Sequence, residues 1–443
     1  MSDAPAHELF VLTPPITEGN RLPEPLCVIQ VALEGRISRQ SVLNSLSRGS
    51  RPAGDLIPWL VSQQFQDDEF ATLSGARVVR IATHPDYIGG GYGSKAIELL
   101  VDYYGGKFTN LSEEADIPME ETMVRVTDAE LANANLRNED IKVRDISKMP
   151  PLFAKLEERR PAALDYVGVS YGLTQPLHKF WKRAAFAPVY LRLTANDLTG
   201  EHTCVMLRPL TDDKSWLGEF ANDFNRRFIS LLSYQFRNFS PIMALSIDES
   251  ATSGSQLSTS NTPAPLTKAD LDLLFTPFDL KRLESYANNV LDYHVILDLV
   301  PMLATLYFTG RLQKDINLNG VQKAILLALG LQRKEVEVIS AELPSISTSQ
   351  VLAMFMKTMK KIASHFGSLV SGAIEAEMPK ADAIGVSVAN ASSAHDDEKV
   401  DTQYAPLETS LEDELEEGGE EALLDLERRQ KQRELIDSLP LDQ

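Results

Sequence analysis

The 443-residue sequence is poor in cysteine and has neither a long apolar run nor a secretion signal. Its two cysteines, Cys27 and Cys204, are too few for a disulfide framework, which favours a reducing compartment, the cytosol or the nucleus. No apolar run reaches the roughly 18 residues that a membrane-spanning helix needs. The opening residues, MSDAPAHELF, lack the basic and apolar pattern of a signal peptide. We therefore expect no membrane partner.

Patterns for metal binding and for serine nucleophiles are also absent. The seven histidines form no H-x-x-x-H pair and no cluster with cysteine, so we expect no metal site. No G-x-S-x-G turn, which would expose a nucleophilic serine, occurs in the sequence. Any chemistry must then come from another kind of site.

The charge is large but unevenly distributed. The net charge of −20 argues at first against a nucleic-acid partner. Residues 381–443 hold 18 acidic and five basic side chains, so about −13 belongs to this tail and about −7 to the rest. Charge alone therefore neither supports nor excludes RNA binding.

The hydrophobic pattern predicts an α/β region, a helical region and an acidic tail. Strands are expected at residues 24–33, 76–84, 164–172, 187–193 and 202–210. Helices are expected at 38–49, 93–106 and 174–186, the last capped by Thr174, and then at 216–236, 279–309, 318–332 and 347–377. The predicted domains are 1–212 with an insertion at about 108–150, 213–377 with a Ser/Thr/Pro linker at 250–266, and a mostly disordered tail at 378–443.

The stretch HPDYIGGGYGS, residues 84–94, is a glycine-rich loop between a predicted strand and a predicted helix. It is not a P-loop, because Ser94 separates Gly93 from Lys95. It matches the dinucleotide pattern G-x-G-x-x-G/A at Gly91, Gly93 and Ala96, but too many residues separate the strand from the first glycine.

A third interpretation is the pyrophosphate loop of acetyl-CoA-dependent acyltransferases, [QR]-x-x-G-x-[GA]. Gly91 and Gly93 occupy its glycine positions, while Ile88 replaces the usual Gln or Arg. Backbone N–H groups of such a loop and of the following helix can bind a pyrophosphate, which needs no particular side chain. A glycine-rich turn without a ligand remains the alternative.

Several separate segments together resemble one family. They include GARVVRIATHPDY (75–87), LDYVGVSYGLT (164–174), HKFWKRAAFAPVYLR (178–192) and PFDLKRLESY (277–286). Over about residues 8–375 the sequence resembles the RNA cytidine acetyltransferases. The resemblance implies a GNAT acetyltransferase fold, a mixed sheet flanked by helices, followed by an α-helical RNA-binding module. It implies transfer of acetyl from acetyl-CoA to cytidine N4 in small-subunit rRNA and tRNA, during ribosome biogenesis in the nucleolus.

The resemblance also implies a cofactor that this sequence would not bind. Members of the family have a helicase-like half with a Walker A loop, where ATP and magnesium are expected. This sequence begins at the acetyltransferase domain and contains no such loop.

The resemblance assigns the cofactor contacts residue by residue. Acetyl-pantetheine is expected along Ile81, Ala82 and Thr83, and Arg183 in FWKR provides a further contact to acetyl-CoA. The pyrophosphate is expected on Ile88, Gly89, Gly90, Gly91, Tyr92, Gly93 and Ser94. The alternative for Arg183 is a solvated helix arginine.

His84 is the candidate catalytic residue. It ends the cofactor strand, and an unperturbed histidine pKa of about 6.5 suits a general base. The alternative is a histidine that caps the turn at His84–Pro85.

The candidate RNA contacts lie in the helical region. They are Lys281 and Arg282 in DLKRLE, and Lys357, Lys360 and Lys361 in FMKTMKKIASHF. The last three are spaced i, i+3 and i+4, so they share one helix face that could bind phosphates. A solvated amphipathic face is the alternative.

The resemblance further implies partners and leaves other functions open. Expected partners are the 18S-type rRNA precursor and the pre-ribosomal particle, tRNA through a THUMP-domain adaptor protein, guide snoRNAs and a second copy in a homodimer. One alternative function is a non-catalytic scaffold in pre-ribosome assembly. Another is a protein or polyamine acetyltransferase.

Overall fold

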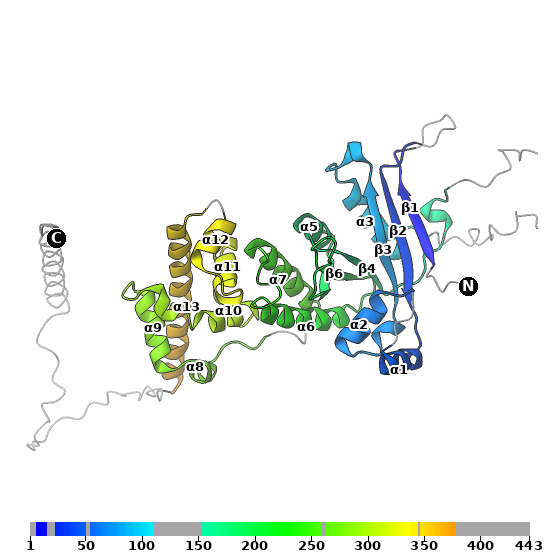
Figure 1. The fold of residues 1–443 in the computed structure, drawn as a ribbon. Coiled ribbons are helices and arrows are strands. Elements are labelled where there is room, and N and C mark those ends of the chain that lie inside the picture. The colour runs from blue at the N-terminus through cyan, green and yellow to red at the C-terminus, as the bar shows by residue number, and fades with distance from the viewer. Residues whose placement is uncertain are drawn as a thin grey trace, which may run out of the picture. The chain divides into compact units, whose positions relative to one another are not determined.

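A computed structural model describes residues 6–15, 23–49, 54–109, 153–258, 263–343 and 346–377 (Figure 1). Apart from Phe108 and Thr109, the predicted insertion at 108–150 lies outside these residues, and so does the predicted tail at 378–443.

A six-stranded mixed sheet forms the first part of the chain. Its order is β1-β2-β3-β4-β6-β5, and only the β3–β4 pair is parallel. The strands are β1 (His7–Leu12), β2 (Cys27–Gly35), β3 (Ser74–Thr83), β4 (Tyr166–Gly172), β5 (Ala187–Leu191) and β6 (Thr203–Pro209). The five predicted strands are confirmed. Strand β1 was not predicted, because its six residues, HELFVL, mix polar and apolar positions.

Helices cover the two sides of the sheet. They are α2 (Ile57–Phe65), α3 (Tyr92–Tyr104) and α5 (Gln175–Arg183), while α1 (Arg39–Arg48) packs on α2 through Val42 and Trp59. On the α3 side, Tyr103 and Tyr104 pack edge-on against Phe10 of β1, with ring centroids 5.4 and 5.9 Å away. On the opposite side, the backbone N–H of Ile57 in α2 donates to the buried carboxylate of Glu34 in β2 over 3.0 Å.

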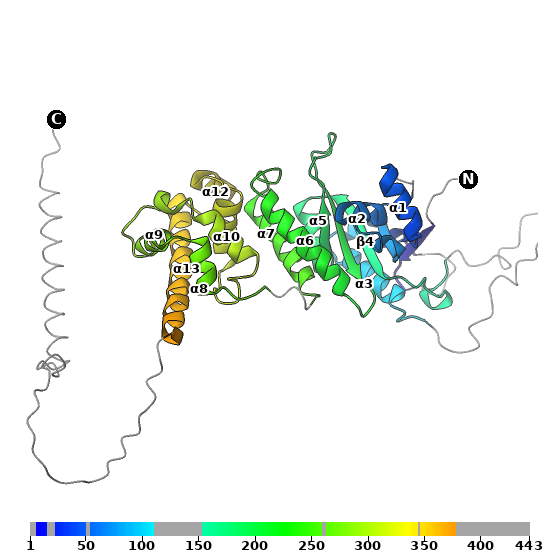
Figure 2. The same cartoon turned by 90° about the horizontal axis from the view of Figure 1, so that it is seen from below.

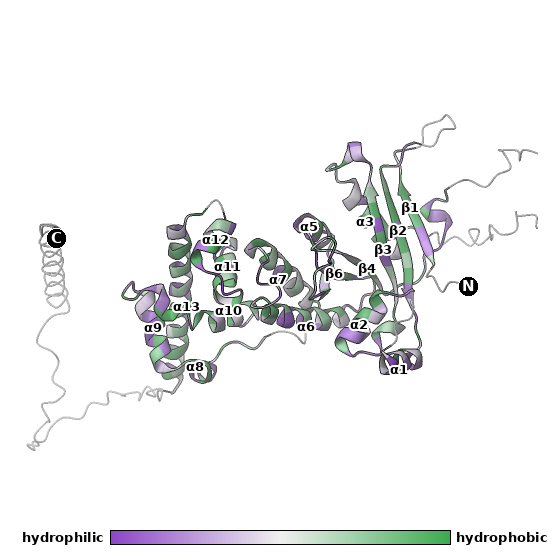
Figure 3. Ribbon diagram, viewed as in Figure 1, coloured by the Kyte–Doolittle hydropathy of each residue, from purple (hydrophilic) through white to green (hydrophobic). Residues whose placement is uncertain are grey.

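The helical region contains eight further α-helices among the described residues (Figure 2). They are α6 (Ser215–Leu231), α7 (Pro241–Ser255), α8 (Lys268–Leu274), α9 (Pro277–Ala287), α10 (Val300–Phe308), α11 (Gly320–Leu326), α12 (Val336–Glu342) and α13 (Thr348–Glu377). Most of these helices carry both hydrophobic and hydrophilic residues along their length (Figure 3).

One predicted helix is wrong in its extent, and one predicted cap is confirmed in its position only. The helix expected at 279–309 is divided, because Asn289 adopts φ of 61° and α10 begins only at Val300, followed by Pro301. Left-handed φ cannot continue an α-helix. Thr174 is the N-cap residue of α5, as predicted, but its side chain makes no capping hydrogen bond. The helix expected at 347–377 is confirmed as α13.

The linker predicted at 250–266 is wrong at its start. Residues 250–255 are the last turns of α7, and Ser250, Ala251 and Gly254 are buried. A Cβ on Gly254 would lie 2.6 Å from the Cβ of Ala187 in β5 and 3.0 Å from the Cβ of Ala221 in α6. The small residues that resemble a linker in the sequence therefore let α7 approach β5 and α6 closely.

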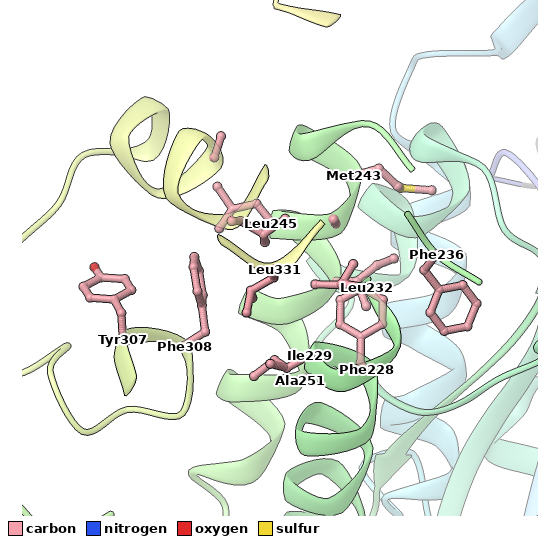
Figure 4. Close-up of a cluster of buried hydrophobic side chains, with 14 of the residues drawn as sticks. Phe228, Ile229, Leu232, Phe236, Met243, Leu245, Ala251, Tyr307, Phe308 and Leu331 are labelled. Carbon is pink, nitrogen blue, oxygen red and sulfur yellow. The ribbon is translucent and has the colours of Figure 1, made fainter. Parts of the chain in front are cut away.

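One hydrophobic cluster continues from the sheet into the helical region. It includes Val78 and Val169 of the sheet, Phe228 of α6, Leu245 of α7 and Phe308 of α10. Figure 4 shows the part where side chains of α6, α7 and α10 meet Leu331. Burial on this scale, at about 25 cal/mol per Å² of apolar surface, is the main stabilising contribution.

The close approach at Gly254 predicts opposite effects for the same substitution in two helices. Gly254→Ala should lower the stability by about 1–3 kcal/mol, because the added methyl group meets side-chain Cβ atoms that cannot rotate away. Gly367→Ala in α13, where a Cβ would meet nothing within 4 Å, should raise it by roughly 0.5–1 kcal/mol. Thermal melting of both variants checks this, and a Gly254→Ala variant as stable as the wild type would contradict it.

Candidate active site

The candidate site begins where the parallel strands β3 and β4 stop pairing. Their ladder joins only Gly75–Val78 of β3 to Tyr166–Val169 of β4. Beyond it, β3 stays paired with β2 as far as Thr83, and β4 stays paired with β6 as far as Gly172. We call the gap between these two strand ends the β3–β4 wedge. Main-chain groups that line such a gap need partners from water or a ligand.

A β-bulge at the start of the wedge decides which side chains face which side of the sheet. Gln30 and Val31 of β2 pair with Arg80 and Val78, so Val79 is the extra residue. As a result Ile81 lies, like Val78, on the α3 side, where it packs against the core. Arg80, paired with Gln30, lies on the opposite side.

Thr83 confirms this arrangement at the strand end. Its hydroxyl donates to Cys27 Sγ over 3.8 Å on the α3 side, and Ala82 lies on the opposite side, paired with Val28. The predicted residues Ile81, Ala82 and Thr83 thus border the wedge with their main chain, while their side chains alternate. No sequence pattern indicated the bulge at Val79.

The glycine-rich loop leads from β3 into the N-terminus of α3. Gly89 and Gly91 have φ of 85° and 82°, a conformation that favours glycine, and a Cβ on either would meet nothing within 4 Å. The side chain of Ile88 is 74% exposed. Gly91 is the N-cap residue of α3, and because glycine has no side chain, no side-chain hydrogen bond caps the helix.

The first turn of α3 offers unpaired donors. Lys95 donates its N–H to the Gly91 carbonyl over 3.0 Å. The N–H groups of Tyr92, Gly93 and Ser94 precede it in the first turn, where a helix has no intrahelical acceptor for them. Together with the positive end of the helix dipole, they form a site for an anion. Gly90, by contrast, already donates its N–H to the Tyr87 carbonyl over 3.2 Å.

Helix α5 meets this loop on the α3 side. A Cβ on Gly93 would lie 3.3 Å from Thr83 Oγ1 and 3.6 Å from the Phe180 ring. Arg183 follows Phe180 by three residues and so shares its helix face. Arg183 is exposed, and the structure gives it no ion-pair partner among the described residues. The role of Phe180 was not predicted, although the residue lies within FWKR.

Hydrogen bonds tie α5 to α7. His178 Nε2 lies 3.1 Å from the Ser246 carbonyl oxygen, and its Nδ1 lies 3.3 Å from the Tyr171 hydroxyl. Burial lowers the pKa of His178. Lys182 pairs with Glu249 over 2.6 Å. These contacts fix the helix that carries Arg183.

His84 occupies the turn after β3. Its backbone N–H donates to the Leu26 carbonyl over 2.9 Å, and its Nδ1 accepts from the Asp86 N–H over 3.3 Å. The side chain is 32% exposed, and Nδ1 lies 3.8 Å from Asp86 Oδ2. A neutral ring that accepts through Nδ1 carries its proton on Nε2. The geometry therefore includes the turn cap that was the alternative for His84.

Two of the predicted RNA contacts, Arg282 and Lys361, already have partners within the protein. Arg282 bonds to Asp279 over 2.5 Å and to Asp298 over 2.8 Å, and these carboxylates raise the pKa of its guanidinium. Lys361 donates to the Asn317 carbonyl over 2.6 Å.

Three of the predicted lysines are free. Lys281, Lys357 and Lys360 are exposed, and the structure gives them no ion-pair partner among the described residues. Lys357 and Lys360 lie on one face of α13. These lysines are therefore better placed for a phosphate than Arg282, whose charge two carboxylates already neutralise.

The described residues contain neither a cluster of metal ligands nor a membrane-spanning helix. Within the part of the chain that the structure describes, no three His, Cys, Asp or Glu side chains group as metal ligands. No helix in the same part is long and apolar enough to cross a bilayer.

Comparison with known proteins identifies both parts of the chain. Residues 1–211 match the family model "GNAT acetyltransferase 2", and residues 216–443 match "Possible tRNA binding domain". The chain carries a GNAT acetyltransferase domain, which implies acetyl-CoA as its cofactor, and then a tRNA-binding-type domain.

Curated relatives match along most or all of the chain. The RNA cytidine acetyltransferase of Saccharomyces cerevisiae is 55% identical over 100% of the chain, and that of Schizosaccharomyces pombe is 51% identical over 100%. The human protein of the same name is 50% identical over 85% of the chain. The chain spans 42% of the length of each yeast relative and 36% of the human one. It therefore belongs to the RNA cytidine acetyltransferase family.

Proposed function

We propose that the chain transfers an acetyl group from acetyl-CoA to the N4 amine of cytidine in RNA. The observation that carries this proposal is the β3–β4 wedge, which runs into a glycine loop and the unpaired N–H groups of α3. A thioester cofactor with a long amide-bearing arm and a pyrophosphate suits these two adjoining features. The names of the relatives support RNA cytidine as the acceptor.

Residues of this chain would hold the cofactor at three places. Main-chain groups of Ile81–Thr83 would bond to the amides of the pantetheine arm. The loop from Ile88 to Ser94 would hold the pyrophosphate, chiefly through the unpaired backbone N–H groups of Tyr92, Gly93 and Ser94, and Arg183 would add a charge-assisted bond to phosphate. When bound, acetyl-CoA supplies an acetyl group activated as a thioester.

The acceptor amine sets the task of the catalytic residue. Cytidine N4 is neutral at pH 7 but its lone pair is delocalised into the ring, so a base must take its proton as the new N–C bond forms. The bond broken would be the C–S bond of the thioester, with CoA leaving as the thiol. We propose His84 for this role. Because Nδ1 accepts from the Asp86 N–H, the ring must exchange that bond before Nδ1 can accept a proton.

From the family resemblance we also propose the substrates, the partners and the cellular location. Small-subunit rRNA and its precursor particle, and tRNA with a THUMP-domain adaptor, would be the substrates, with guide snoRNAs selecting sites in the nucleolus. ATP and magnesium would bind a helicase-like part that this sequence does not include. The chain would act in ribosome biogenesis, as a homodimer.

Labelled acetyl-CoA distinguishes the proposed function from its alternatives. The chain is tested alone, and also in place of the matching segment of the Saccharomyces cerevisiae relative. Mass spectrometry of digested RNA should then detect labelled acetylcytidine. Label only in protein or polyamine would indicate the alternative acetyltransferase. If neither the chain alone nor the chain in the yeast relative labels any acceptor, a scaffold would be favoured.

A charge in the loop should abolish cofactor binding. Gly93→Glu places a carboxylate where the first turn of α3 should receive phosphate, next to Thr83 and Phe180. Calorimetry with acetyl-CoA should detect no binding. Gly320→Glu, which adds the same charge at the first residue of α11 in open space, is the matched control and should bind normally. Normal binding by Gly93→Glu would refute the loop assignment.

Removal of the proposed base should separate catalysis from binding. His84→Ala should keep its affinity for acetyl-CoA and lose acetylation by about 10²- to 10⁴-fold, as expected for a general base. Rates from single-turnover assays and calorimetry measure the two effects. A variant that turns over like the wild type would rule out the assignment, and a variant that no longer binds acetyl-CoA would indicate a structural role in the turn.

The free lysines of α13 should contribute to RNA affinity. The double variant Lys357→Glu/Lys360→Glu should bind RNA more weakly, with a slope of log K against log salt reduced by about 1.5 for two lost phosphate contacts. Lys155→Glu/Lys214→Glu makes the same change of net charge at two exposed lysines away from α13. Fluorescence anisotropy at several salt concentrations compares them, and equal slopes would contradict the assignment.

A further inference from the structure

The side of the sheet opposite α3 has two different halves. The half where β3 and β4 are paired is covered by α2, because the side chain of Ile57 packs where a Cβ on Gly168 would lie. At the wedge, the backbone alternation of the strands brings Arg80 and Ala82 of β3, and Ser170 and Gly172 of β4, to this side. Arg80 and Ala82 are exposed.

The cofactor loop lies on the other side, so among the described residues the exposed side of Arg80 and Ala82 is the approach that suits an acceptor. Gly93 of the loop meets Thr83 and Phe180 on the α3 side, where α3 and α5 fill the space. An acceptor base that reaches the wedge would therefore come from the side of Arg80 and Gly172.

Glu201 lies at that entrance, on the β4 edge. A Cβ on Gly172 would overlap with Glu201 Oε2, so the carboxylate lies directly over the Cα of Gly172. The neighbouring Leu173 donates its N–H to the His202 carbonyl over 2.8 Å, which holds this part of the hairpin beside the end of β4.

The backbone of Glu201 is anchored but its carboxylate is not engaged. Asn196 donates its N–H to the Glu201 carbonyl over 2.9 Å, and Glu201 donates its own N–H to Thr199 Oγ1 over 3.4 Å. Among the described residues, the structure gives the carboxylate no hydrogen-bond or ion-pair partner, although the residue is half-buried. A half-buried carboxylate is stabilised by a donor, so this position favours a ligand that brings an N–H group.

Cytosine brings such a donor at the reacting atom itself. Glutamate accepts a hydrogen bond from the exocyclic N4 amine when proteins read cytosine. N4 has two hydrogens, so one can bond to a carboxylate while the other is removed during acetylation. A charge-assisted bond to the first hydrogen would orient the amine and raise the electron density on nitrogen.

We propose that Glu201 accepts a hydrogen bond from the N4 amine of the acceptor cytosine and holds it at the open side of the β3–β4 wedge. The proposal rests on the proposed function and adds the residue that recognises the acceptor. Gly172 is the complementary feature, because only a residue without a side chain leaves room for this carboxylate.

Three variants test the role of the carboxylate. Glu201→Ala should lower kcat/KM for RNA roughly 10- to 100-fold, the effect of one charge-assisted hydrogen bond, with unchanged affinity for acetyl-CoA and unchanged melting temperature. Gly172→Ala keeps the carboxylate of Glu201 but displaces it, and should lower kcat/KM for RNA by a similar factor. The double variant should lose no more than Glu201→Ala alone, because both changes remove one interaction. Asp197→Ala, an exposed acidic residue of the same hairpin, is the control and should act like the wild type.

The substrates are labelled acetyl-CoA and an RNA oligonucleotide with a single cytidine. Each variant is tested as the chain alone and in place of the matching segment of the Saccharomyces cerevisiae relative. If the wild type forms no acetylcytidine, the proposed function fails. If the wild type does so and Glu201→Ala matches it, the proposed function stands and the role of Glu201 is refuted. A weaker affinity for acetyl-CoA or a lower melting temperature in Glu201→Ala would also refute the proposed role, since either result would show that Glu201 is a structural residue.

Discussion

The end of hydrogen bonding between β3 and β4 is the constraint on which the site depends. Parallel strands pair through Val78 and Val169 and no further, yet both continue, each held by its outer neighbour β2 or β6. The bulge at Val79 lies at this point, where it keeps Ile81 and Thr83 in the hydrophobic row of the α3 side. The sheet thus opens without losing its core, and the opening leads to the N-terminus of α3.

The helical region contributes to the site through the packing of α5. Buried polar contacts from His178 to Ser246 and the Lys182–Glu249 pair join α5 to α7, and α7 in turn packs closely on β5. One hydrophobic cluster includes both regions. The tRNA-binding-type part is therefore also the support for the helix that carries Arg183. The basic residues of this part are not equivalent. Two carboxylates neutralise the charge of Arg282, whereas Lys357 and Lys360 are exposed to solvent.

Much of the fold and part of the site could be predicted from the sequence. Long apolar strands and the glycine loop were recognisable because their residue types and period are local. The position of β1, the bulge at Val79 and the limit of β3–β4 pairing were not, because they depend on partners far away in the chain. The sequence at the end of α7 resembles a linker, since small residues are typical both of flexible chain and of close helix packing. Nothing in the sequence singles out Glu201, because its relation to Gly172 exists only in three dimensions.

We propose that acetyl-CoA occupies the wedge and the loop together. Hydrogen–deuterium exchange of the chain with and without acetyl-CoA is the sharpest test, because it reports on backbone amides in both places. Exchange should become slower in β3 beyond Val78 and in residues 88–94, with α13 unchanged. Unchanged exchange in either segment at saturating acetyl-CoA would contradict it.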